Sequence, residues 1–385
     1  MNNTIRLKVD DVLPQLNEVA KVVNPKAVLP ILQDLMVEVY KSDEGGKLIL
    51  TASDIDTWVS VKATLIDVGF DMRICVNAQR IAQVFNGLKG QEVDIEVDAN
   101  AKSLKINYRN GKYEMPYEDA NEFPSAEEAS EELSSISVST EKLGKSISST
   151  EFAAAQDPLR PIMNGIHFDC KRDALYTAAS DGLKLSRHKD LSVRVADNEE
   201  ELSFTYPKAP AQTLSRLLAL ADEDVTIKFN ERIAVVVCSH FKVVTRLVDG
   251  KYPDYNRVIP TDNHNKVIVN RCALIDALNR NIIFSDTHST LIKIELGNGG
   301  LVVLGENIDY SCSGREEVQC EYNGDAFKIG FNGGTLVSLL RSLKGDEVEL
   351  ALKDESHACV LRSHPYSEED EEQDLLLIMP LRLNT

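Results

Sequence analysis

The chain has 385 residues and a formal net charge of −19, and 43% of its residues are hydrophobic. This length exceeds what one hydrophobic core usually supports, so we expect a soluble protein of two or three domains. The longest apolar run, Leu375–Leu381, is too short to cross a bilayer, and the amino terminus lacks the basic-then-apolar layout of a signal peptide. The seven cysteines are scattered without a CxxC pair, which favours buried thiols in the reducing cytoplasm over disulfides.

The negative charge is concentrated in two places. Residues 118–132 hold seven acidic side chains and residues 368–374 hold six, with no basic residue in either run. These thirteen charges leave only −6 for the rest of the chain, so the net charge does not exclude a basic surface elsewhere. Both runs are typical of solvated loops.

In chain order, the sequence repeats one set of predicted elements three times. The first copy is a helix over 12–23, strands over 32–39 and 48–54, and a helix, turn and strand over 81–93. The second copy has the same elements over 140–152, 163–168, 175–181 and 214–225. The third has them over 272–279, 291–296, 301–307 and 336–348. Helices are indicated by apolar residues three or four apart, and strands by alternation and β-branched content.

Each of the three copies ends in the same sequence pattern: a helix that carries leucines, an acidic turn and a strand. Five and eight places before the closing valine of each copy stands an apolar residue: Leu88 and Phe85, Leu220 and Leu217, Leu343 and Leu340. A spacing of three places both residues of a pair on one helical face. Self-similarity at this spacing predicts three like domains, which we expect over 1–126, 136–260 and 262–385.

Strands outnumber helices and are joined by short hairpins, so the predicted fold class is α+β. We expect three repeated domains, each with two helices and antiparallel sheets.

No arrangement of residues predicts an active site. The chain has no glycine-rich phosphate loop after a strand and no His-Glu-x-x-His or zinc-ligand spacing. Cys238 with His240, and His357 with Cys359, lack the further ligands that a metal site needs. Ser53-Asp54 and Ser180-Asp181 recur without a paired base and are more typical of turns in which aspartate binds its own backbone. We therefore predict a protein that is not an enzyme and has no catalytic residue, no metal and no cofactor.

Basic residues recur on the predicted helices of all three copies: Lys21, Lys26, Arg80, Lys89, Lys142, Lys145, Arg216, Arg271, Arg280, Arg341 and Lys344. Any one of them alone is ordinary decoration of a solvated helix. Equivalent faces of a repeat array can line one continuous surface, however, and such a surface could contact duplex phosphates without reading bases.

Several segments resemble the bacterial DNA polymerase III beta subunit family, the sliding clamps: Arg246–Pro260, Leu29–Leu32, Asn164–Gly165, Thr177–Gly182 and Met379–Leu383. The resemblance implies the DNA clamp fold and a head-to-tail homodimer that closes as a ring around duplex DNA. It implies as partners the replicative polymerase subunit, a clamp loader and other replication and repair proteins with short peptide motifs, and it implies no membrane. The alternative is a repeated-domain interaction scaffold that does not encircle DNA.

The resemblance also implies site residues. The partner-peptide pocket would use Met163, Ser180, Gly182, Leu183, Lys184, Leu185, Pro253, Arg257, Val258, Ala358, Leu377, Ile378, Met379, Pro380, Leu381 and Arg382. DNA would be contacted by Lys26, Arg80, Gln156 and Arg160, and the dimer interface would use Tyr113, Met115, Ile283 and Phe284. For residues 375–383 a buried final strand is also compatible with the pattern, and core packing is an equal alternative for each interface residue. Leu183 and Lys184 stand where the family often has histidine and arginine, which leaves the peptide preference open.

Overall fold

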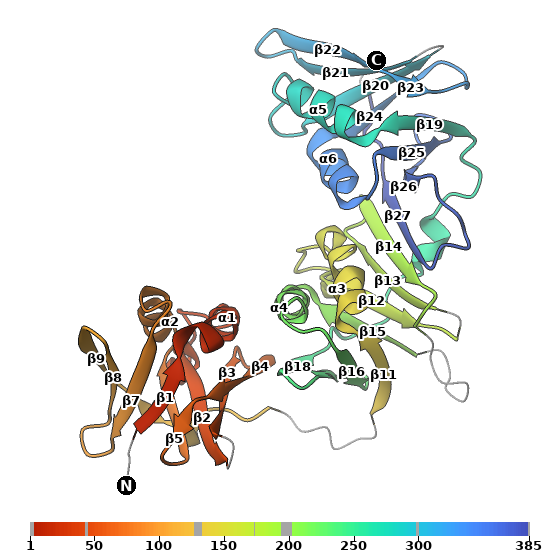
Figure 1. Cartoon of the computed structure of the whole chain (residues 1–385). Helices are drawn as coiled ribbons and strands as arrows, with labels where there is room; N and C mark the ends of the chain where they lie inside the picture. The colour runs from red at the N-terminus through yellow and green to blue at the C-terminus, as the bar shows by residue number, and fades with distance from the viewer. Residues whose placement is uncertain are drawn as a thin grey trace. The chain divides into compact units, whose positions relative to one another are not determined.

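The computed structural model describes residues 4–42, 45–126, 133–172, 174–193, 202–297 and 300–383 (Figure 1). It divides into two compact units, unit 1 (Met1–Gly144 and Ala209–Leu247) and unit 2 (Lys145–Lys208 and Val248–Thr385). Residues 127–132 of the first predicted acidic loop lie outside the described residues. No helix in the described ranges is long and apolar enough to cross a membrane.

Unit 1 begins with two helices and the strands around them. In chain order these are β1 (Thr4–Lys8), α1 (Val9–Ala20), β2 (Asp34–Ser42), β3 (Gly45–Ser53), β4 (Thr57–Leu65), β5 (Asp67–Val68), β6 (Met72–Asn77), α2 (Ala78–Gly87), β7 (Glu92–Asp98), β8 (Ser103–Tyr108), β9 (Gly111–Pro116) and β10 (Glu118–Asp119). Helices α1 and α2 pack against each other. The Asn77 side chain caps α2 by accepting the N–H of Arg80 (3.1 Å).

The rest of unit 1 comes from the second predicted domain. It comprises β11 (Ser134–Ser139), the first part of α3 (Thr140–Ser148), nearly all of α4 (Lys208–Leu218), β16 (Asp224–Phe229), β17 (Ile233–Val237) and β18 (Phe241–Arg246). One sheet has the order β5-β1-β7-β8-β9, and the other runs β10-β6-β2-β3-β4-β18-β17-β16-β11. Strands β4 and β18 are antiparallel neighbours, with Thr57 opposite Thr245, so one sheet joins the first and second predicted domains.

Unit 2 joins the second and third predicted domains in the same way. Its main elements are β12 (Gly165–Cys170), β13 (Leu175–Ser180), β14 (Lys184–Asp190), β15 (Leu202–Pro207), β19 (Asn265–Asn270), α5 (Arg271–Ile282), β20 (Leu291–Gly297), β21 (Gly300–Asn307), β22 (Cys312–Val318), β23 (Cys320–Glu321), β24 (Phe327–Asn332), α6 (Gly333–Ser342), β25 (Glu347–Leu352), β26 (Cys359–His364) and β27 (Glu372–Ile378). One sheet has the order β15-β12-β13-β14-β27-β26-β25-β19-β23, and the other has the order β22-β21-β20-β24. Here β14 pairs with β27, with Lys184 opposite Ile378.

The predicted fold class is confirmed. Each repeat has two helices, and every strand pair in the described residues is antiparallel. The predicted helix over 140–152 is too long, because α3 ends at Ser148 and a short 3₁₀ turn follows over Glu151–Ala153. The prediction that both residues of each pair lie on one helical face is wrong, since α2, α4 and α6 end at Gly87, Leu218 and Ser342, before the later residue of each pair. Leu88 and Leu343 are nevertheless buried just beyond their helices, whereas Leu220 is exposed.

Candidate peptide-binding site

An apolar cluster in unit 2 gathers residues from five separate segments of the chain. Its buried members are Ala155, Met163, Ala178, Leu185, Tyr252, Tyr255, Ala358 and Leu377, with Ile162 and Ile259 packed against them. Four of these belong to the predicted pocket: Met163, Leu185, Ala358 and Leu377. Leu185 of β14 lies opposite Leu377 of β27, so the junction of two predicted domains forms the floor of the cluster.

Exposed apolar side chains surround this floor. Leu183 is 64% exposed, Val258 58% and Met379 39%. The N–H of Met379 donates to the carbonyl of Leu183 (2.8 Å), which holds two of them side by side. Large apolar groups exposed beside a buried apolar floor are typical of a site that docks a partner.

The turn before β14 holds Leu183 in place. The Asp181 carboxylate accepts the N–H groups of Leu183 (2.8 Å) and Lys184 (2.9 Å), and Lys184 Nζ lies 2.6 Å from it. Burial raises the pKa of Asp181, but these hydrogen bonds outweigh burial and leave the pKa below its ordinary value. Gly182 has φ +93°, and Arg160 lies 3.2 Å from the place of an added Cβ, so the turn favours glycine. The interpretation of Ser180-Asp181 as a turn is confirmed.

The segment after β18 is fixed by aromatic residues that the sequence analysis did not single out. Tyr252 stacks on His167 with ring centroids 4.7 Å apart, and the Tyr255 hydroxyl donates to Asp169 (3.0 Å). Burial lowers the pKa of His167 to about 4 and raises that of Tyr252 to about 12. Both tyrosines lie inside Arg246–Pro260, the segment that resembles the clamp family, but the sequence did not predict these contacts.

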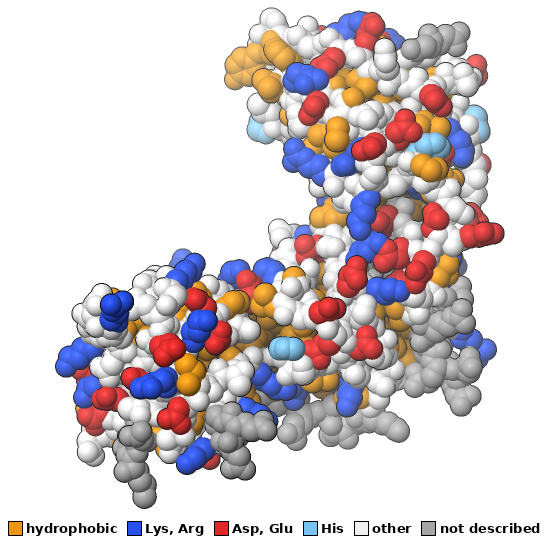
Figure 2. All heavy atoms as spheres, in the orientation of Figure 1, with side chains coloured by type: hydrophobic (Ala, Val, Ile, Leu, Met, Phe, Trp, Pro, Cys, Tyr) orange, Lys and Arg blue, Asp and Glu red, His pale blue; other side chains and the backbone are white. Residues whose placement is uncertain are grey.

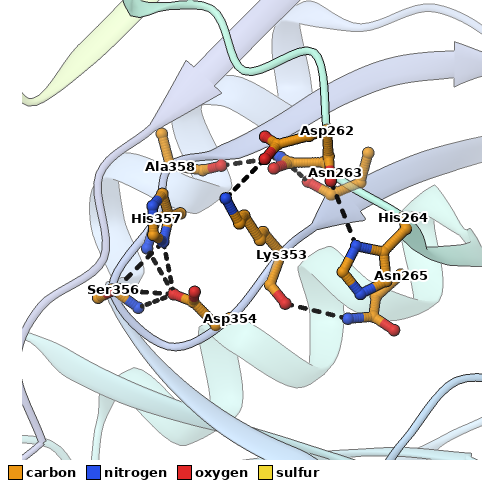
Figure 3. A network of polar contacts seen from close by, with 10 residues as sticks. Asp262, Asn263, His264, Asn265, Lys353, Asp354, Ser356, His357 and Ala358 are labelled. Atoms are coloured by element: carbon orange, nitrogen blue, oxygen red, sulfur yellow. Dashed lines mark hydrogen bonds and ion pairs between the residues drawn. The ribbon is translucent and has the colours of Figure 1, made fainter.

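A polar network fixes the far wall of the site (Figure 3). Asn263 Nδ2 donates to the carbonyls of Ala351 and Ala358, both at 2.9 Å, which ties the linker before β19 to the β25–β26 turn. Lys353 Nζ lies 2.6 Å from Asp262, and this hydrogen bond lowers the pKa of Asp262. The network therefore holds Ala358 against the cluster.

The last described residues form the buried final strand that the sequence pattern allowed. Leu377 and Ile378 are buried in β27, as a final core strand requires. Beyond Pro380, the N–H of Leu381 donates to Gly330 (2.8 Å), and Arg382 is exposed. Pocket residues Ser180 and Lys184 are partly buried at the rim, whereas Pro253 and Arg257 are exposed.

A groove of about 550 Å³ lies beside the cluster, and no sequence pattern predicted it. Its lining includes Arg187, Asn256, Ile259, Lys266, Val360, Arg362 and Tyr366. The Arg362 guanidinium stacks 4.6 Å from the centre of the Tyr366 ring. The groove brings basic side chains next to the apolar floor.

The predicted DNA-contact residues fall in both units. Lys26 and Arg80 are exposed in unit 1 and have no side-chain partner among the described residues. Gln156 is exposed in unit 2, but the exposed Arg160 pairs with Asp157 (2.8 Å) and donates to the Asp181 carbonyl (3.2 Å). Its guanidinium is thus engaged by the pocket turn.

Other helical cations are also paired with acids. Lys21 and Arg216 both contact Glu18 (2.6 and 2.8 Å), and Arg280 contacts Glu316 (2.5 Å). On the face shown in Figure 2, basic and acidic side chains are intermixed on each unit. The helices therefore present a less cationic surface than the sequence alone indicated.

The predicted interface residues differ in exposure. Tyr113 on β9 is exposed, as are Ile283 and Phe284 just after α5. Met115 is only 3% exposed, so its side chain packs within its own chain, the alternative that the sequence left open.

Two groups of possible metal ligands come together. Cys238 and His240 lie with Glu223, so the prediction that this pair lacks a further ligand is wrong. His240 Nδ1 is 2.5 Å from Glu223, and this hydrogen bond lowers the pKa of the glutamate to about 2. The second group contains His188 and Glu372.

The second group also contains Asp190, and its members contact other protein groups. Lys145 pairs with Glu372, His188 Nδ1 lies 2.7 Å from Asp374, and Asp190 accepts the N–H of Ser192 (2.8 Å). In the first group, Glu223 accepts a hydrogen bond from the Ser239 hydroxyl (2.7 Å).

Threefold repetition of two helices with antiparallel sheets defines a protein of the DNA clamp class. Family models of the N-terminal, central and C-terminal domains of the DNA polymerase III beta subunit match residues 3–127, 137–254 and 256–382. The chain belongs to the DNA polymerase III beta subunit family, as the resemblance predicted.

Relatives agree over nearly the whole length. The beta sliding clamp of Pseudomonas aeruginosa is 29% identical over 372 residues, covering 96% of this chain and 97% of the relative. That of Vibrio cholerae is 23% identical over 369 residues, covering 96% of each. A crystal structure of a DnaN sliding clamp from Pseudomonas aeruginosa bound to griselimycin has a TM-score of 0.89 and 27% identity, covering 99% of both chains.

Proposed function

We propose that two chains join head to tail around duplex DNA and tether the replicative polymerase and other DNA-handling proteins to it. The chain acts by topology and binding, without catalysis. Family membership supports this function, and the observation that carries it concerns two of the edge strands of the described sheets, β9 and β22. Unpaired edges invite the addition of another strand.

The two open edges occupy the same places in the repeat as the edges that meet inside the chain. Strand β22 follows β20 and β21 as β4 follows β2 and β3, and as β14 follows β12 and β13. Strand β9 ends its repeat as β18 and β27 end theirs. Since β4 pairs with β18 and β14 with β27, the repeat predicts that β22 pairs with β9 of a second chain.

Both internal junctions give the same register for that pairing. Three residues occupy the same place in the last strand pair of their repeats. Tyr113 faces Ile106 of β8, Val243 faces Val236 of β17, and Leu376 faces Leu361 of β26. On the facing side, Gly314 faces Gly305 of β21, Val59 faces Ala52 of β3, and Ser186 faces Ala179 of β13, so Gly314, Val59 and Ser186 are equivalent. Val243 faces Val59 and Leu376 faces Ser186, so Tyr113 would face Gly314 of the second chain.

The side chains at this position fit the register. A Cβ on Gly314 would lie 2.9 Å from the Phe284 ring, so the glycine leaves room that the ring partly fills. Tyr113 of a second chain would therefore lie over Gly314 and against Phe284. Ile283, which is exposed beside it, would extend the apolar contact.

We assign the remaining roles on the same basis. Lys26, Arg80, Gln156 and Arg160 would contact DNA weakly, which suits a ring because tight phosphate binding opposes sliding. A clamp loader would open the ring, since a closed ring cannot thread onto circular DNA.

The cluster in unit 2 would bind short partner peptides that carry leucine and aromatic anchors, through the sixteen pocket residues predicted from the sequence. We place the domains at 1–126, 136–260 and 262–385, and the protein in the cytoplasm.

Retention on DNA tests this function. The protein is loaded onto nicked circular plasmid, which is then either linearised or treated with salt. A topological ring stays on circles at high salt and is lost when the plasmid is cut. If linearisation changes nothing while salt removes the protein, ordinary phosphate binding is at work and the proposal is wrong.

A further inference from the structure

We propose that unit 1 contains a second copy of the peptide site, which the chain closes with its own side chains. This inference rests on the proposed peptide-binding role of the cluster in unit 2. The ligand class of the second copy is the same, a short peptide with apolar anchors. In the native chain the indole of Trp58 occupies the place of that anchor.

The turns at the two sites have the same hydrogen bonds. Before β4, the Asp54 carboxylate accepts the N–H of Thr57 (2.7 Å), and before β14 that of Asp181 accepts the N–H of Lys184 (2.9 Å). In both turns the residue after the aspartate donates its N–H to the preceding serine hydroxyl, at 3.0 and 3.1 Å. The backbone of the second site is therefore complete.

The linkers at the two sites also match. Tyr117-x-Asp119-x-Asn121 repeats as Tyr252-x-Asp254-x-Asn256. The Asp119 carboxylate accepts the N–H of Asn121 (2.9 Å), and the Asp254 carboxylate accepts that of Asn256 (3.2 Å). Each begins a short 3₁₀ turn. Both sites thus share the same kind of turn and the same kind of linker.

The floors carry different residues at equivalent positions. Leu185 faces Leu377 in unit 2, and the equivalent residue of unit 1, Trp58, faces Val244. Trp58 is 6% exposed, and its indole N–H donates to the Pro124 carbonyl (3.0 Å). The larger indole ring thus occupies the position that the Leu185 side chain holds in unit 2.

The indole is surrounded by a cluster that corresponds to the one in unit 2. Leu32, Cys75, Ala120, Phe123 and Val244 are buried with it. Phe123 is buried in the linker, whereas Val258 in the matching linker is exposed. The apolar groups that would receive an anchor in unit 1 are therefore already covered.

The mouths of the two sites differ in charge. The N–H of Arg246 donates to the carbonyl of Asp56 (2.9 Å), as that of Met379 donates to Leu183 (2.8 Å). In unit 1 the two side chains form an ion pair (3.1 Å), whereas in unit 2 both are exposed and apolar. Charged groups at the mouth oppose the entry of an apolar peptide, because they would lose hydration without gaining a partner.

A graft of the open site onto the closed one tests the inference. The variant W58L/V244L/F123V/D56L/R246M replaces the floor pair, the buried linker ring and the charged mouth of unit 1 by their counterparts in unit 2. The probe is a synthetic peptide with leucine and phenylalanine anchors. Calorimetry should give one peptide per chain for the native protein and two for the variant. A folded variant that still binds one overturns the inference, and a native protein that binds none contradicts the proposed peptide site instead.

The reciprocal change gives a result even if the graft fails to fold. L185W should close the site in unit 2 and abolish peptide binding, with Leu185→Met as the matched control that retains it. Trp58 is the only tryptophan of the chain, so its emission reports on the closed site alone. Saturating peptide should leave native emission unchanged. Binding by L185W at native affinity, or a peptide-dependent shift in native emission, would overturn the inference.

Discussion

The register proposed for the dimer can be tested with a disulfide bond between the two chains, formed by a cysteine introduced at position 115. Met115 would face Cys312 of the second chain, as Thr57 faces Thr245 inside unit 1. At that internal position the two hydroxyls are 3.0 Å apart. The neighbouring pair carries the backbone hydrogen bond, so this is a non-hydrogen-bonded pair, the kind in which side chains approach most closely.

The expected geometry is within reach of a disulfide. Facing Cβ atoms in such a pair are roughly 4.5–5.5 Å apart, and a disulfide needs about 3.5–4.5 Å, so a small closure suffices. Met115→Cys removes part of a buried side chain and should cost about 1–2 kcal/mol of unfolding free energy. Mild oxidation should then convert most of the 42.7 kDa chains to a covalent dimer on a non-reducing gel.

Two controls make the result specific. In M115C/C312S the covalent dimer should disappear, because the partner thiol is gone. Glu114→Cys places the thiol on the opposite face of β9 and should cross-link far less. Equal cross-linking of M115C and E114C would show that the register is wrong. A non-covalent dimer in which M115C never cross-links would show that other edges meet.

Further predictions follow from the interface, the pocket, the buried histidine and the DNA contacts. Phe284→Asp should give monomers by sedimentation, and an unchanged mass would remove it from the interface. Leu183→Asp, at an exposed rim position, should weaken peptide binding at least tenfold with an unchanged melting temperature, whereas equal affinity would contradict the pocket. His167 has a folded pKa of about 4 against about 6.5 unfolded, so stability present above pH 6.5 should fall by at most about 3 kcal/mol as pH drops to 4. Urea titrations should show this slope flattened in His167→Gln, and an equal slope in the variant would assign it elsewhere. Lys26→Glu should reduce the salt dependence of binding to a short duplex by about 0.9 in the logarithmic slope, and an unchanged slope would exclude a phosphate contact there.

The sequence by itself determined the repeat, the fold class and several of the segments that meet at the apolar cluster of unit 2. Apolar spacing along helices and alternation along strands are local signals, and they recur at fixed separations, so three like domains could be read without a structure. The turn at Ser180-Asp181 was also predictable, because aspartate binding its own backbone is a local interaction.

Only the tertiary structure decided how those segments pair and which side chains are left available. The contact of Thr57 with Thr245 spans 188 residues, and no periodic pattern specifies such a partner. The same holds for the burial of Met115, the engagement of Arg160 by the pocket turn and the place of Trp58. Strand pairing fixes which residues face each other, and packing then decides whether equivalent positions in a repeat become an open site or a closed one.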